Sequence, residues 1–172
     1  MNKFLLPLIF LILFIFESLF IQFLPSYLFD SQKILIPHFL IVSIFFLTIF
    51  GNEKRGIVYG LIFGLLFDIV YTEIIGIYLF IFPLVTYVVS KIMKVLQTNI
   101  FIGSFVSLIG VALLETGVFE MDKLIHITNM NFMNFLEMRL LPTLFLNTIF
   151  IILAAYPLKR QFEKFAESLR AD

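Results

Sequence analysis

Residues 56–68 read Gly-Ile-Val-Tyr-Gly-Leu-Ile-Phe-Gly-Leu-Leu-Phe-Asp, an apolar run in which glycine returns at every fourth position. Positions four apart lie on one face of an α-helix, so Gly56, Gly60, Gly64 and Asp68 form one continuous stripe. Small residues on such a stripe let two helix backbones approach closely, as in helix pairs within lipid. The stretch therefore predicts a tightly packed membrane helix that carries a carboxylate at its far end.

The rest of the chain is similarly apolar. Of its 172 residues, 61% are hydrophobic and only 14% are charged. The mean hydropathy is +1.07, whereas about 45–50% of the residues are apolar in a typical soluble domain. A soluble fold of this size cannot hide so much apolar surface, because its exterior must remain wettable. The composition therefore indicates an integral membrane protein.

Charged and turn-forming residues divide the sequence into six apolar blocks, each near the roughly 20 residues that a helix needs to cross a bilayer. The third block is the shortest, about 24 Å long at 1.5 Å per residue. We expect the connection 120–137 to lie along the membrane surface and residues 159–172 to extend the last helix. The sequence thus predicts one all-α domain over residues 1–172, with spans at about 4–24, 34–50, 56–71, 74–92, 100–119 and 140–158.

The distribution of Lys and Arg predicts the orientation, because cytoplasmic loops are enriched in these residues. With six spans, the loops divide between two sides of the membrane, and the side with few cations has only Lys33, Lys123 and Arg139. An even number of spans with both termini in the cytoplasm agrees with this bias. The predicted cytoplasmic set is Lys3, Lys54, Arg55, Lys91, Lys94, Lys159, Arg160, Lys164 and Arg170.

Five polar residues lie in or beside the spans, and their cost in the membrane must be compensated, since a charge at mid-bilayer costs roughly 2.5–3.5 kcal/mol on insertion scales. They are Glu17, Asp68, Glu115, Arg139 and Asn147, all predicted toward the external leaflet. One interpretation is mutual satisfaction, with Arg139 bound to one carboxylate and Asn147 to a backbone carbonyl. In particular, Asp68 is a candidate partner for Arg139 or for a cation of another protein. The other interpretation is an externally open polar pocket or docking site, and the sequence leaves both open.

Signals of catalysis or metal binding are poor. The chain has no Cys, and its two His, His38 and His126, are far apart. Asp68 and Glu73 are five residues apart at a helix end, a spacing that does not make two acids face each other across a water. The formal net charge is zero, so no basic surface suggests nucleic acid. We expect no enzyme activity, no metal and no cofactor.

Several motifs together resemble the MreD family of rod shape-determining membrane proteins, and its Gram-positive, Bacillus-like members in particular. The strongest stretch is 59–68 with Tyr71-Thr72 and Gly76-Ile77-Tyr78, similar to the family's glycine-rich third helix, its terminal Asp and the Gly that opens the next span. Further matches are Ser90-Lys91 to Asn99, Leu113-Leu114-Glu115, and Arg139 to Thr143 with Pro142 and Asn147. One departure is His38 after Pro37, where Bacillus-like members carry Arg.

The resemblance implies a non-catalytic, multi-pass component of the cell-wall elongation machinery in the bacterial cytoplasmic membrane. Its implied partners are an MreC-like single-pass protein and membrane lipids and, indirectly, an MreB-like actin homologue, a RodA-type glycosyltransferase and a class B penicillin-binding protein. The family's fold looks like that of the S components of energy-coupling-factor vitamin transporters. A small-molecule-binding S component is therefore the alternative function.

Overall fold

The computed structural model describes residues 5–23, 33–72 and 74–171, and within these ranges all regular structure is helical. Six long helices follow one another along the described chain. A short helix, α6 (Phe132–Phe135), and a π-helical turn, η1 (Leu136–Leu140), precede the last of them. The long helices are α1 (Leu5–Phe23), α2 (Phe39–Phe50), α3 (Glu53–Tyr71), α4 (Ile77–Val95), α5 (Ile100–Leu124) and α7 (Leu141–Ala171).

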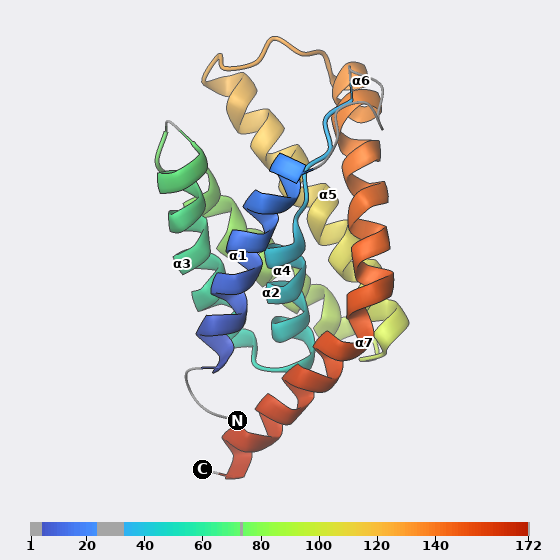
Figure 1. Ribbon diagram of the computed structural model, residues 1–172. Coiled ribbons are helices and arrows are strands. Elements are labelled where there is room, and N and C mark those ends of the chain that lie inside the picture. Colours follow the sequence, from blue (N-terminus) through green and yellow to red (C-terminus); the bar gives the residue numbers. More distant parts are fainter. Residues whose placement is uncertain (1–4, 24–32, 73, 172) are drawn as a thin grey trace.

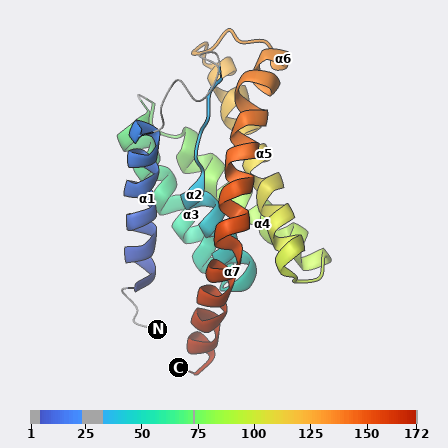
Figure 2. The ribbon, with the colours of Figure 1, turned by 45° about the vertical axis from the view of Figure 1, so that its right-hand side comes forward.

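Consecutive long helices run in opposite directions through the bundle. In Figures 1 and 2, α1, α3 and α5 end toward the upper end of the molecule, and α4 and α7 begin there. Helix α2 begins further down, after residues 33–38 have run down from that end. The start of α1 and the end of α7 therefore both lie at the lower end, together with the α2–α3 and α4–α5 connections. The two ends of the bundle are called upper and lower below.

Helix α2 is the centre of the core. Eleven of its 12 residues are buried, and it packs against α1, α3, α4, α5 and α7. A helix that is apolar on every side belongs inside a bundle, because it has no face that suits water. At 1.5 Å per residue, α2 is about 18 Å long, too short to cross roughly 30 Å of hydrocarbon alone.

The remaining distance is covered by residues 33–38, which are not helical. The predicted span 34–50 is therefore wrong at its start, since the helix begins only at Phe39. The cause is Pro37, which disfavours helical backbone at the residue before it. Non-helical backbone at membrane depth is tolerated where protein groups bind its N–H and C=O groups, and α7 provides them, as described below.

Other helix ends also differ from the predicted spans. Helix α3 begins at Glu53 instead of residue 56, because the Asn52 side chain accepts the backbone N–H of Arg55 and caps the charged first turn. Helix α4 begins at Ile77, three residues late. Helix α5 continues to Leu124, so the predicted surface connection 120–137 is helical at both ends. The predicted helical tail is confirmed, since α7 runs on to Ala171.

Three stretches of the described chain are long and apolar enough to cross a membrane: Ile77–Val95, Ile100–Leu124 and Phe132–Leu169. The apolar stretches Leu5–Phe20 and Phe39–Phe50 are shorter. The outer surface of the bundle is apolar as well, with Phe101 81% and Leu153 74% exposed. Large apolar side chains so exposed on several helices suit lipid, not water.

Candidate functional site

A buried carboxylate, Glu115 in α5, binds two cationic or proton-donating side chains from distant parts of the chain. One Glu115 oxygen lies 2.5 Å from His38 Nε2, at the start of α2, and the other accepts Arg139 Nε at 2.7 Å, from η1. Arg139 Nη1 also lies 3.9 Å from Asp122, seven residues after Glu115 and on the same face of α5. We call His38, Glu115, Asp122 and Arg139 the Glu115 cluster.

The burial of this cluster makes its pairing important. Glu115 and His38 are essentially inaccessible, whereas the Arg139 and Asp122 side chains keep 17% and 18% exposure. The cluster therefore grades from a buried interior to a partly open rim. Removing one partner of a buried ion pair strands the other charge, which costs about 3–5 kcal/mol.

Asn147 of α7 binds the non-helical segment that precedes α2. Its Oδ1 accepts the His38 N–H at 2.9 Å, and its Nδ2 donates to the Ile36 carbonyl at 3.0 Å. One turn earlier, Thr143 Oγ1 accepts the Ile36 N–H at 3.2 Å. Two side chains of α7 thus satisfy the backbone that Pro37 keeps out of a helix. We call Thr143 and Asn147 the Asn147 clamp.

Pro142 also helps α7 to bind this segment, because its missing N–H leaves a backbone carbonyl of the preceding turn free. Proline has no N–H, so Pro142 offers no donor to the carbonyl of Met138 four residues before it. That carbonyl instead accepts the Ile34 N–H at 2.7 Å. The π-helical turn η1 lies directly before Pro142, and such turns often occur at functional sites. The segment 34–38 is therefore held along η1 and the first turns of α7.

Asp68, at the end of α3, caps the start of α4. Its Oδ2 accepts the N–H groups of Gly76 and Leu79, at 2.8 and 2.9 Å, and its Oδ1 accepts that of Tyr78 at 2.9 Å. A helix start has unpaired N–H groups and a positive dipole end, so a buried carboxylate is stabilised there. Asp68 does not pair with Arg139, which binds Glu115 instead, so that predicted pairing is wrong.

Glu17 has a similar position at the start of α2. It is 3% exposed, and its Oε2 accepts the Leu40 N–H at 3.0 Å from the first turn of that helix. His38, the residue that precedes α2, makes no side-chain capping bond to it. Two buried acids, from α1 and α3, thus satisfy the starts of α2 and α4 in place of local capping residues.

The glycine stripe faces two neighbours of α3. A Cβ added at Gly56 would lie 1.9 Å from Thr48 Oγ1 of α2, and one at Gly60 would lie 3.2 Å from Thr86 Oγ1 of α4. At Gly64 it would meet the Tyr78 carbonyl oxygen at 2.4 Å, which is backbone. Close approach along this stripe brings Asp68 within reach of the α4 start.

The comparisons with known proteins identify the family of this chain. A family model described as rod shape-determining protein MreD matches residues 2–165. The chain belongs to the MreD family. It is also 35% identical over 170 residues to the rod shape-determining protein MreD of Bacillus subtilis (strain 168), covering 99% of each chain. No solved structure matches it. As an MreD-family member, it is a non-catalytic protein of the cytoplasmic membrane that takes part in rod shape determination.

The five polar residues singled out in the sequence do not form one site in this MreD-family protein. Glu115 and Arg139 bind each other directly, and Asn147 is joined to them through His38. Asp68 and Glu17 bind helix starts separately. Within the described ranges, no group of three or more His, Asp or Glu side chains is arranged to hold a metal ion.

Three contributors were missed by the sequence reasoning: His38, Asp122 and Thr143. A signal existed for Asp122, because a seven-residue spacing places it on the Glu115 face of one helix. A signal existed for Thr143 too, one turn before Asn147. The sequence marks His38 as one of two distant His and as a departure from the family's Arg, and neither feature points to Glu115. Its Nδ1 is buried without a hydrogen-bond partner in the described part of the chain.

Replacing Asp68 by Asn tests the cap on α4. An amide keeps one acceptor oxygen but turns an NH₂ donor toward N–H groups that the carboxylate accepted, and each buried polar group left unpaired costs about 1–3 kcal/mol. We expect Asp68→Asn to lower the unfolding midpoint in detergent clearly. An unchanged midpoint would show that the cap contributes little.

Gly76 belongs to this cap and is more constrained than its position at a helix start suggests. Its φ is +129°, where L side chains are strained, although nothing lies within 4 Å of an added Cβ. Any side chain added at position 76 would therefore be disfavoured by backbone strain and not by crowding.

Proposed function

We propose that this MreD-family protein crosses the membrane six times, with the lower end of the bundle in the cytoplasm. The six long helices of the described ranges alternate in direction (Figure 1). Basic residues of the described chain concentrate at the lower end, in the first turn of α3, the last turns of α4 and the second half of α7. Because Lys and Arg favour the cytoplasmic side, this supports both termini inside. It also makes the upper end, with the Glu115 cluster, external.

Single cysteines test this orientation, since the native chain has none. A membrane-impermeant thiol reagent applied to intact cells or protoplasts should label Thr72→Cys and Thr128→Cys. It should label Asn52→Cys, Val95→Cys and Glu163→Cys only after the membrane is opened. External labelling at position 52 or 95 would overturn the orientation.

We further propose that the protein is a multi-pass component of the cell-wall elongation complex. The observation that carries this proposal is the MreD-family match along nearly the whole chain. Its direct partner would be an MreC-like single-pass protein. An MreB-like actin homologue, a RodA-type glycosyltransferase and a class B penicillin-binding protein would be reached through the assembly.

The Glu115 cluster and the Asn147 clamp have a supporting role in this proposal. They join α2, α5, η1 and α7 at the upper end through paired, mostly buried groups. A rigid surface binds a partner with little loss of conformational entropy. The polar residues would thus shape the external end for the MreC-like protein, with the Arg139–Asp122 rim as its accessible part.

Two observations test this function. Purified from its own host in mild detergent, the protein should bring down an MreC-like protein, and its depletion should round and widen rod-shaped cells whatever nutrients are supplied. Co-purification with an energising ATPase module, together with rescue by a single vitamin, would favour the S-component alternative instead. Normal rods after depletion would contradict the proposal.

A further inference from the structure

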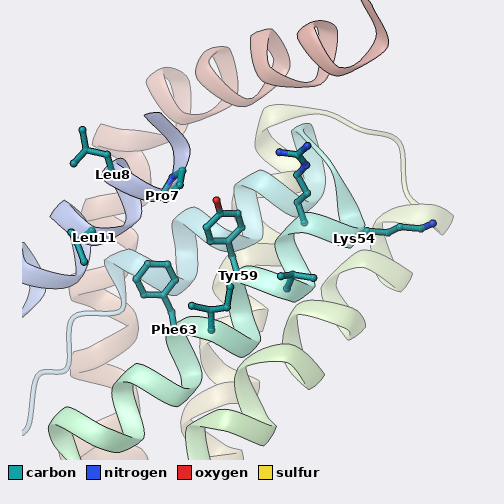
Figure 3. Close-up of a pocket in the computed structure, with 9 residues that line it drawn as sticks. Pro7, Leu8, Leu11, Lys54, Tyr59 and Phe63 are labelled. Carbon is teal, nitrogen blue, oxygen red and sulfur yellow. The ribbon is translucent and has the colours of Figure 1, made fainter. Parts of the chain in front are cut away.

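A groove of about 720 Å³ lies between α1 and α3 at the lower end of the bundle. Its walls are apolar along most of its length and cationic at one end. Figure 3 shows the Tyr59 hydroxyl on the side of Pro7 and the Phe63 ring on the side of Leu11. The lining residues are Pro7, Leu8, Leu11, Lys54, Arg55, Val58, Tyr59, Ile62 and Phe63.

The α3 wall changes polarity in steps. Arg55, Tyr59 and Phe63 are four residues apart and so share one face, next to the face of the glycine stripe. Along this face a full charge is followed by a ring with a hydroxyl and then by a purely apolar ring. The three residues span about 12 Å of helix at 1.5 Å per residue. That order matches a lipid entering from the lower end, with phosphate, glycerol ester and acyl chain in turn.

The cations at the groove end are not neutralised locally. Neighbouring Glu53 is turned to α4, where it binds Lys94 Nζ at 2.8 Å and accepts the Ser90 hydroxyl at 2.6 Å. Within the described residues, neither Lys54 nor Arg55 has an acidic partner within 4.0 Å. The Arg55 guanidinium lies 4.9 Å above the Phe165 ring of α7, which holds it near the groove end. Lys54 extends away from α1 in Figure 3, but it is exposed, and its long side chain can reorient.

The groove stays open because α1 and α3 meet through aromatic side chains, not through close backbones. The Phe10 and Tyr59 rings are tilted against each other with 4.9 Å between their centroids, and the Phe14 and Phe67 rings meet edge to face at 5.4 Å. These rings fill the interior side of the α1–α3 contact. Val58, 54% exposed, and Leu11, 46% exposed, remain on the outer side. An apolar surface at membrane depth that protein leaves uncovered is covered by lipid.

We propose that this groove is a binding site for an anionic phospholipid, with one acyl chain along Leu11, Val58 and Ile62 and the phosphate at Arg55 and Lys54. Basic pockets between membrane helices bind anionic headgroups in this manner. The site does not depend on the proposed partners. It rests on the proposed orientation only for its leaflet, which would be the cytoplasmic one.

Native mass spectrometry of the purified full chain tests the charge end, with phosphatidylglycerol and phosphatidylcholine of identical acyl chains as probes. Each Lys or Arg near a lipid headgroup contributes about fivefold in affinity for an anionic lipid. We therefore expect the wild type to bind phosphatidylglycerol at least fivefold more tightly. Arg55→Gln should lose most of that preference, and Lys54→Gln/Arg55→Gln all of it. Lys91→Gln/Lys159→Gln removes two cations outside the groove and should retain it.

A second pair of variants tests the apolar part. Leu11 and Leu61 have similar exposure, 46% and 48%, but only Leu11 lines the groove. Leu11→Trp should fill the groove and weaken binding of phosphatidylglycerol at least threefold, while Leu61→Trp should leave it unchanged. Equal affinity of the wild type for both lipids would overturn the proposal, as would equal effects within either matched pair. Neither result would bear on the rod-complex function, which cell shape and co-purification test separately.

Discussion

Glu115→Gln is expected to lower the free energy of unfolding by about 3–5 kcal/mol, because it leaves Arg139 without its charged partner in a largely buried site. Unfolding of the purified protein in mixed micelles of mild detergent and SDS, followed by circular dichroism, would measure this. Glu120→Gln is the matched control on the same helix. Glu120 is exposed, so its change should stay within about 0.5 kcal/mol. Equal effects of the two substitutions would contradict a stabilising role of the cluster.

The same unfolding measurement, applied in a double-mutant cycle, gives the coupling free energy between Glu115 and Arg139. Arg139→Gln alone strands Glu115, whereas the double change Glu115→Gln/Arg139→Gln strands neither charge. The double variant should therefore be less destabilised than the sum of the single variants, by about 1–3 kcal/mol. Additive effects would mean that the 2.7 Å contact contributes little coupling. Asp122 remains near Arg139 in the Glu115 variant, so some compensation for the Arg charge is retained.

Gly64→Ala should destabilise the bundle although it adds a single methyl group. The added carbon would lie 2.4 Å from the Tyr78 carbonyl oxygen, which is backbone of α4 and cannot rotate away. We expect a loss of about 1–3 kcal/mol, typical of overpacking, and little folded protein for Gly64→Leu. Fluorescence-detected size-exclusion chromatography of membrane extracts would show both.

Gly117→Ala is the control for this substitution. Gly117 lies inside α5, two turns before its end, and the nearest atoms to an added Cβ are side-chain carbons of Ile81 at 3.5 Å, an ordinary contact. Alanine favours helix over glycine by about 1 kcal/mol, so Gly117→Ala should be neutral or stabilising. If Gly64→Ala behaves in the same way, α3 and α4 can separate slightly at no cost, and close packing there is not essential.

The sequence predicted which stretches are apolar better than it predicted where helices begin and end. Membrane spans are recognised by composition, but a helix ends where its backbone hydrogen bonds change. At Glu53 the helix extends into charged residues because Asn52 caps it. At residues 34–38 an apolar stretch is not helical because Pro37 and the Asn147 clamp favour non-helical backbone. Hydropathy carries no information on either effect.

For the polar side chains of the site, the sequence predicted the type of partner group but not which residue supplies it. The sequence indicated that Arg139 needs a carboxylate and Asn147 a backbone carbonyl, and the structure contains both contacts. The choice of Glu115 over Asp68 depends on the packing of α5 against η1, which no local pattern encodes. Asp68 instead binds backbone N–H groups within 11 residues of itself, a local contact that the Gly76 turn makes possible.

Helix α7 has a further consequence, for imaging. Its 31 residues extend about 46 Å at 1.5 Å per residue, and it passes Pro157 before it runs beneath the bundle in Figure 1. Phe162 and Phe165, near its end, are 0% and 3% exposed, so the tail is fixed against the other helices instead of trailing from them. A fluorescent protein joined rigidly to this helix would therefore turn with the whole molecule. Its polarised emission would report the tilt of the protein in the membrane as well as its location along the cell.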